Sequence, residues 1–288
     1  MQNSLLSRFH GGIVGSIIAT SGKKDGPMSQ GGLLGSHFLS LISAGKLDGG
    51  EWVNLIPDEM QHWQKTLSSS ETALATVPIA IFFHENSVLL TEMLAKAAAI
   101  WLGPTELGED VIIWGKAIAS ALQGKSNFMT QLIADLATFS TPLREQLELV
   151  ENLLVSQTGL EQARSILRSS KKESQTEIAL ALYCFGYTPE NFGLAVLRAL
   201  NTKRESMIVA ALTGAIAGFY NGYSGIPVSW RLPSSTNSAQ SYQMTKKLFA
   251  LWSGVYFPET TELPPTIACS SPGVIQKRAC LKIISQKP

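Results

Sequence analysis

The sequence predicts an all-α protein, a compact globule of many short helices. Apolar residues recur at the spacing of one helix face through most of the chain, and the two-residue alternation typical of strands is almost absent. Clusters of glycine, proline and serine separate the periodic segments, so we expect short helices and brief connections. At 288 residues the chain is long enough to bury a large core.

Four apolar stripes predict helices in the first half of the chain. They consist of Leu34, Phe38, Leu41 and Ile42; of Leu90, Leu94, Ala97 and Trp101; of Val111, Trp114, Ile118, Ala121 and Leu122; and of Phe128, Leu132, Leu136 and Phe139. The segment "GGEWVNLIPDEMQHWQ" lacks this period and indicates a loop. Its two tryptophans, Trp52 and Trp63, are expected to fill the core, although one of them could instead anchor a partner.

Polar residues predict where several later helices begin. Thr141 and Thr188 each precede a proline, which favours an N-cap followed by the first helical turn. The pattern Ser174-x-x-Glu177 has the spacing of a capping box, and so does Thr202-x-x-Glu205. The second pattern predicts that the charges Lys203, Arg204 and Glu205 cap a buried helix.

The helix expected after Thr202 carries small residues four apart, at Ala210, Gly214, Gly218 and Gly222. Such a row leaves almost no side chain on one face, so another helix can approach it closely. Asn221-Gly222 and Pro227 are expected to end this helix.

Composition changes after Trp230. We interpret "RLPSSTNSAQSYQ" as a polar linker, "MTKKLFALWSGVY" as a short amphipathic helix, and the proline-rich remainder as an irregular tail. The expected organisation is therefore a helical domain over residues 1–230, with residues 231–288 packed on it or trailing from it.

Composition also argues against some classes of function. Charged residues make up 16% of the chain and the net charge is +1, so we expect neither nucleic acid nor a membrane as a partner. Three cysteines without a C-x-x-C pattern fit a reducing compartment. No apolar stretch reaches the ~20 residues of a membrane span, and no targeting segment is evident, so a cytoplasmic protein is expected.

Isolated reactive side chains offer little chemistry. The histidines at positions 10, 37, 62 and 84 do not have the spacing of metal ligands, and core or rim positions are commoner for such residues. Cys184 lies among Leu182, Tyr183 and Phe185, which favours inert packing over a nucleophile.

Two segments carry a resemblance to a known family. The stretch "ALNTKRESMIVAALTGAIAGFYNGYSGIPVSW", with its Ala-Ala-x-x-Gly-Ala-x-x-Gly helix and closing Ile226-Pro227-x-x-Trp230, resembles the C-terminal signature of the ADP-ribosylglycohydrolases. The opening "RFHGGIVGSIIATS", with Gly11 and Gly15 four apart, is similar to the first helix of that family. The resemblance spans about residues 7 to 230 and is strongest at both ends.

The resemblance implies an all-α fold with a cleft at helix N-termini. It also implies hydrolysis of ADP-ribose linkages with a pair of divalent cations, usually Mg²⁺, held by aspartates and hydroxyls of a Thr-Asp-Asp-Thr and a Gly-Asp-Thr-Asp-Thr cluster. Hard cations of this kind need several anionic oxygen ligands.

This sequence departs from both clusters, so it resembles a degenerate member of the family. The second cluster falls on Arg204, Glu205, Ser206, Met207 and Ile208, and the first falls on Met28, Ser29, Gln30 and Gly31. Thr20 stands where the family's first helix ends in Gly-Asp. The vestigial cleft positions are therefore Thr20, Ser29, Gln30, Glu205, Ser206 and Met207, and too few carboxylates remain for two divalent ions.

The leading hypothesis is a pseudoenzyme without a metal or other cofactor, which binds a protein partner or an ADP-ribose-like ligand. Lys203 and Arg204 at a helix N-terminus are the candidate residues for binding its phosphates. The alternative is an active ADP-ribosyl hydrolase with an atypical Mg²⁺ site built on Glu205, Ser29 and Thr20. A third hypothesis is an unrelated helical assembly factor, which the Ile-Pro-x-x-Trp ending disfavours.

Overall fold

The fold is all-α, as the apolar spacing predicts. The computed structural model describes residues 4–20, 30–43, 45, 49, 51–62, 64–103, 108–124, 128–136, 142–169, 173–203, 206–231, 235–254, 268–269 and 275–276. The first helices are α1 (Leu5–Thr20), α2 (Gln30–Ser43), the 3-10 helix η1 (Trp52–Leu55), α3 (Asp58–Gln61), α4 (Ser69–Ala75), α5 (Val77–Phe83), α6 (Ser87–Leu102) and α7 (Gly108–Gln123). They are followed by α8 (Phe128–Asp135), α9 (Pro142–Val155), α10 (Leu160–Arg168), α11 (Glu173–Tyr187), α12 (Phe192–Leu200), α13 (Ser206–Gly225), α14 (Val228–Arg231) and α15 (Ser235–Ser253). Two two-residue strands, β1 (Ala268–Cys269) and β2 (Ile275–Gln276), pair antiparallel.

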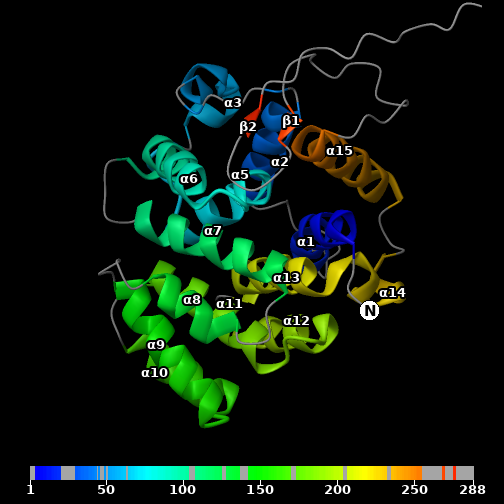
Figure 1. Cartoon of the computed structure of the whole chain (residues 1–288). Coiled ribbons are helices and arrows are strands. Elements are labelled where there is room, and N and C mark those ends of the chain that lie inside the picture. Colours follow the sequence, from blue (N-terminus) through cyan, green and yellow to red (C-terminus); the bar gives the residue numbers. More distant parts are fainter. Residues whose placement is uncertain are drawn as a thin grey trace, which may run out of the picture.

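Helices α1 and α13 lie side by side near the centre of the molecule (Figure 1). Their backbones touch through glycines, because a Cβ added at Gly11 would lie 2.5 Å from the carbonyl oxygen of Gly218, and one added at Gly15 would lie 2.2 Å from that of Gly214. The predicted small-residue row on α13 is therefore confirmed, and α1 is the helix that packs on it. The order of these contacts shows that the two helices run antiparallel.

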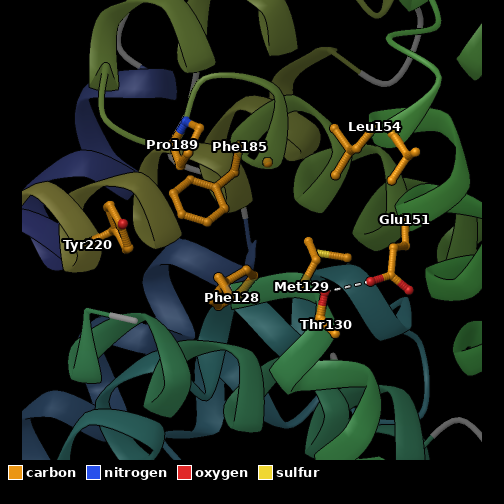
Figure 2. Close-up of a pocket in the computed structure, with 10 residues that line it drawn as sticks. Phe128, Met129, Thr130, Glu151, Leu154, Phe185, Pro189 and Tyr220 are labelled. Atoms are coloured by element: carbon orange, nitrogen blue, oxygen red, sulfur yellow. Dashed lines mark hydrogen bonds between the residues drawn. The ribbon is translucent and has the colours of Figure 1, made fainter. Parts of the chain in front are cut away.

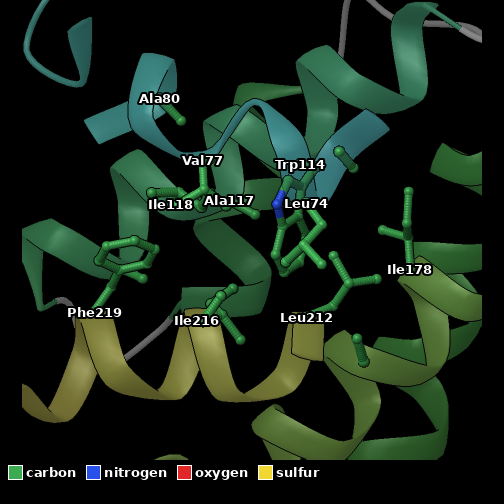
Figure 3. Close-up of a cluster of buried hydrophobic side chains, with 14 of the residues drawn as sticks. Leu74, Val77, Ala80, Trp114, Ala117, Ile118, Ile178, Leu212, Ile216 and Phe219 are labelled. Atoms are coloured by element: carbon green, nitrogen blue, oxygen red, sulfur yellow. The ribbon is translucent and has the colours of Figure 1, made fainter. Parts of the chain in front are cut away.

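The predicted apolar stripes form one hydrophobic core. The described members of the stripes on α6 and α7 are at most 4% exposed, and those on α8 at most 5%. Figure 3 shows the centre of this core, where Leu212, Ile216 and Phe219 of α13 face Trp114 and Ala117 of α7. Trp52 is 1% exposed and its ring contacts that of Phe38, so it belongs to the core as expected. Phe139 and Trp63 lie outside the described residues.

Two predicted helix starts are wrong. Helix α12 begins after Asn191, whose side chain accepts a hydrogen bond from the Leu194 backbone, so the N-cap is not at Thr188. Thr202 is buried at the end of α12, where its hydroxyl donates to the carbonyl of Ala199 at 2.7 Å, and α13 starts only at Ser206. At α12 the side chain of Asn191, which is nearer to the helix, takes the place of the expected cap. At Thr202 the hydroxyl is instead used in a contact with the preceding helix.

The other starts agree better with the sequence. Helix α9 begins at Pro142, with Thr141 outside the described residues, and α11 begins at Glu173, one residue before the expected cap Ser174. A capping box is formed at Ser68, which accepts from the Glu71 backbone while the Glu71 carboxylate accepts from the Ser68 backbone. The residues Ser68 and Glu71 have the Ser-x-x-Glu spacing that predicts such a box.

Helix α15 differs most from the expectation. Residues 235–243, interpreted above as part of a polar linker, form the first half of this 19-residue helix. The helix packs on α1 and α2, with Leu248 fully buried and the rings of Phe249 and Trp252 each 5.6 Å from that of Phe9. The buried side chains that the structure describes on α15, which are Thr245, Leu248, Ala250 and Leu251, all lie in its second half.

Within the described chain, none of the helices combines the length and hydropathy that a membrane span requires.

Candidate functional site

The antiparallel pairing of α1 and α13 brings the two ends of the family-like sequence together. Gly15 of α1 lies beside Gly214 of α13, and both helices rise about 1.5 Å per residue. The backbone of Thr20, the last residue of α1, is therefore at about the level of Val209. Thr20 thus lies at the same end of the molecule as Ser206 and Met207, which open α13.

The start of α13 presents apolar side chains. Met207 and Ile208 are both half-buried, and Ile208 packs against the hydrophobic core. A thioether and a hydrocarbon stand where the resemblance places oxygen ligands, and neither is a ligand for a hard divalent cation. The side chains that the structure describes at this end therefore do not fit as ligands of a pair of Mg²⁺ ions.

Some of the predicted site residues lie outside the part of the chain that the structure describes. Ser29, Arg204 and Glu205 are outside the described residues, and Gln30 is the first residue of α2. In the described parts of the chain there is no group of three or more His, Cys, Asp or Glu side chains that could hold a metal ion.

Lys203 occupies the connection between α12 and α13. Its φ of 62° is in the left-handed region, which is uncommon for residues other than glycine. Its ammonium donates to the Glu161 carboxylate of α10 at 2.8 Å, and Arg164 lies 3.5 Å from the same oxygen. The hydrogen bond from Lys203 holds the pKa of Glu161 below its ordinary value. Lys203 and Glu161 are 60% and 62% exposed, so the ion pair is weak and a competing anion can displace the carboxylate.

Arg8, near the start of the family-like first helix, has a structural role. Its guanidinium donates at 2.7 Å to the carbonyl of Leu122 in the last turn of α7. It also packs on Gly124, where an added Cβ would lie 2.7 Å from the guanidinium nitrogens. A cation at the C-terminal end of a helix is favoured by the helix dipole, so Arg8 joins α1 to α7.

The buried histidines and Cys184 belong to the core, as the sequence indicates. Burial lowers the pKa of His10 and that of His84 to about 4, so both rings are neutral at pH 7. His84 lies against Trp252 and His10 against Tyr223. Burial raises the pKa of Cys184 to about 12, which leaves its thiol protonated and unreactive.

A pocket lies further along α13, away from this end. It is lined by Phe128, Met129, Thr130, Glu151, Leu154, Val155, Phe185, Gly186, Pro189 and Tyr220. Tyr220 is fourteen residues beyond Ser206, about 21 Å along the helix axis, so the pocket is separate from the cleft that the resemblance implies. The sequence does not reveal this pocket, because its residues come from four helices and, at Pro189, the connection between α11 and α12, which become neighbours only in the fold.

Fold and site together define an all-helical globule whose candidate cleft lies where the end of α1 meets the start of α13. The family model described as ADP-ribosylglycohydrolase matches residues 27–256, and the chain therefore belongs to the ADP-ribosylglycohydrolase family. This membership rules out the unrelated helical assembly factor.

The fold is also similar to that of a solved structure. A chain described as "ADP-ribosylglycohydrolase-related protein complex" superposes with a TM-score of 0.59 at 16% sequence identity, covering 85% of this chain and 96% of that one. No protein of curated function matches the sequence.

Proposed function

We propose that this protein is a non-catalytic member of its family that acts by binding. The observation that carries the proposal is the start of α13, where Met207 and Ile208 are half-buried at positions that the resemblance assigns to metal ligands. Dehydrating two divalent ions must be offset by several charged oxygens, and Glu205 is the only carboxylate of that segment. Hydrolysis that depends on two metal ions is therefore not expected.

The proposed ligand is a nucleotide sugar or another phosphate-bearing molecule, held at the start of α13. Helix α13, whose backbone stays helical from Ser206 until Gly222 (φ 66°, ψ 174°), directs backbone N–H groups and a positive partial charge toward its N-terminus. Lys203 and Arg204 precede that terminus by three and two residues, respectively. The weak pair between Lys203 and Glu161 supports this role, because a phosphate can take the place of the exposed carboxylate.

A thermal-shift screen with ADP-ribose, in the presence and absence of Mg²⁺, tests the proposal. A ligand that binds the native state raises its Tm by mass action. We expect a shift with ADP-ribose that does not depend on Mg²⁺. The double variant Lys203→Glu, Arg204→Glu should lose the shift, and an unchanged shift in that variant would contradict phosphate binding at this place.

Glu161→Gln provides a companion measurement. This change removes the charge that competes for Lys203, so the affinity for inorganic pyrophosphate should increase severalfold. Glu148→Gln on α9 is the matched control, because its carboxylate pairs with Arg144 and not with Lys203. Equal effects of the two variants would show that only the net charge of the protein matters.

A protein partner in place of a small ligand remains part of this proposal. The similar solved structure is described as a complex. We also propose the cytoplasm as the compartment, from the cysteine usage of the sequence. Absence of any thermal shift with ADP-ribose and related nucleotides would favour the protein partner.

The second candidate function is an active ADP-ribosyl hydrolase with an atypical metal site. The observation that favours it is the placement of Thr20 and Ser206 at the same end of the molecule, with Glu205 adjacent in sequence. Thr20, Ser29 and Glu205 would supply its oxygen ligands. Calorimetry with Mg²⁺ and Mn²⁺ distinguishes the two functions, since no binding at millimolar ion would exclude the hydrolase.

A further inference from the structure

The pocket on the far part of α13 has an apolar interior. It holds about 310 Å³, which is the volume of about ten water molecules and lies at the lower end of the range for small-molecule sites. Phe128, Met129 and Phe185 are at most 8% exposed and form its inner surface. The ring of Phe185 lies 5.2 Å from that of Phe128 and 5.5 Å from that of Tyr220, so three aromatic side chains form one continuous wall.

One end of the pocket is acidic. Figure 2 shows the carboxylate of Glu151 at one side of the aromatic cluster and Tyr220 at the other. Thr130 donates to Glu151 Oε1 at 2.7 Å, which orients the carboxylate and leaves Oε2 available. Within the described residues, Glu151 forms no ion pair.

The pocket is also accessible, and glycine sets its width. Val155 at the rim is 80% exposed, so a ligand can enter from solvent. A Cβ at position 186 would lie 2.6 Å from Cδ1 of Leu154, which means that Gly186 lets this side chain withdraw from the cavity. A fixed carboxylate beside an aromatic wall is complementary to a molecule with an apolar body and one positive charge.

We propose that this pocket binds a small organic cation, an ammonium group on an aromatic or aliphatic body of roughly a dozen heavy atoms. The apolar body packs on Phe128, Met129 and Tyr220, and the ammonium donates to Glu151. This site is independent of the phosphate site proposed at the start of α13, because about 21 Å of helix separates the two.

The test uses three molecules of almost the same shape that differ in charge. These are tryptamine, the neutral tryptophol and the anionic indole-3-propionate, each titrated into the full-length protein by NMR or calorimetry. We expect tryptamine to bind about tenfold more tightly than tryptophol, because a charge-assisted hydrogen bond is roughly twice as strong as a neutral one. Indole-3-propionate should bind most weakly. ADP-ribose should not displace tryptamine.

Three variants assign the effect to the pocket. Glu151→Gln retains an acceptor for Thr130 but removes the charge, so it should abolish the preference for tryptamine and leave tryptophol binding unchanged. Glu148→Gln, which removes a carboxylate of the same helix that does not line the pocket, should leave the preference intact. Gly186→Ala should weaken both ligands by pushing Leu154 into the cavity, and alanine in place of a helical glycine favours folding.

Several results would overturn the proposal. If tryptamine does not bind at millimolar concentration, the site is excluded. If the three ligands bind with the same affinity despite their different charges, the role of Glu151 is excluded. A preference for tryptamine that survives Glu151→Gln, or is lost equally in Glu148→Gln, would place the cation elsewhere on the surface.

Discussion

Gly11 and Gly218 are residues at which the fold has no room for a side chain. A Cβ at position 218 would lie 2.1 Å from the carbonyl oxygen of Gly11, and this oxygen belongs to backbone that cannot rotate away. Helices normally pack 8 to 10 Å apart through side chains, whereas here two backbones are in contact. The spacing of glycines in the sequence therefore has a specific structural cause.

Gly218→Ala should lower the free energy of unfolding by about 3 kcal/mol or more, because α1 and α13 must separate to accommodate the methyl group. Urea denaturation followed by circular dichroism measures the change. Gly159→Ala is the control: nothing lies within 4 Å of an added Cβ there, and its effect, which includes the weaker preference for alanine at the N-cap of α10, should stay within about 1 kcal/mol. Similar losses for the two variants would contradict close backbone packing.

His10 and His84 make the stability of the protein dependent on pH. Burial lowers their pKa to about 4, whereas an exposed histidine in the unfolded chain has a pKa of about 6.5. Between these values the unfolded state binds protons that the native state does not. The free energy of unfolding is therefore at its full value above about pH 6.5 and falls as the pH decreases toward 4, by on the order of 3 kcal/mol for each histidine.

Urea titrations between pH 7.5 and 4.5 check this dependence. In the variant His84→Phe, whose ring can keep the contacts with Phe9 and Trp252, the decline should be about half as steep. Identical slopes in the variant and in the wild type would show that His84 is already protonated or exposed in the native state.

The sequence predicts single residues well only where a regular pattern surrounds them. The buried positions of α6 and α7 follow from their helical period, because one face of each helix repeats the same environment. Thr202 could not be assigned in this way, since its Thr-x-x-Glu spacing fits an N-cap and its actual partner, Ala199, belongs to the preceding helix. Competition between two neighbouring helices for one hydroxyl is not visible in local spacing.

At the scale of elements, α15 is the helix whose role changes most between sequence and structure. Its first half carries mostly polar side chains, and a polar segment with serine and asparagine is typical of a linker. In the structure its second half covers α1, with aromatic contacts to Phe9. Such tertiary packing overrides local propensity, and it depends on a partner surface more than two hundred residues earlier in the chain.

Two adjacent residues of α15 test this packing. Leu248 is fully buried and Lys247 is exposed. Leu248→Ala should destabilise the protein by roughly 2 to 5 kcal/mol through the lost contacts and the cavity, whereas Lys247→Ala should change the free energy of unfolding by less than about 0.5 kcal/mol. Thermal denaturation measures both, and a neutral Leu248→Ala would indicate that α15 is detached in solution.

For the whole molecule, the expected domain of residues 1–230 stays a prediction, and the packing of α15 bears on it directly. A chain truncated after Arg231 would expose the face of α1 that contains Phe9, together with part of α2. We expect this truncated chain to unfold less cooperatively and to bind a hydrophobic dye such as ANS. A truncated chain with the same Tm as the full-length protein would show that residues 1–230 fold independently.

The overall architecture was predictable from sequence to a greater extent than the site. Helical periodicity is repeated in many segments, so the all-α class does not depend on any one of them. The candidate cleft depends on a few positions at the start of α13, and its neighbour Thr20 comes from the other end of the chain. The pocket beside Phe185 and Glu151 requires the relative placement of four helices, which no local pattern encodes.

The glycine contact between α1 and α13 also constrains the order of events during synthesis. About 200 residues separate the two helices, so α1 leaves the ribosome roughly 10 to 40 s before its partner at ordinary rates of elongation. Throughout that interval the glycine face of α1 at Gly11 and Gly15 has no α13 beside it, and the opposite apolar face around Phe9 has no α15 to cover it. Nascent chains of this protein should therefore depend on chaperones until translation has passed residue 253.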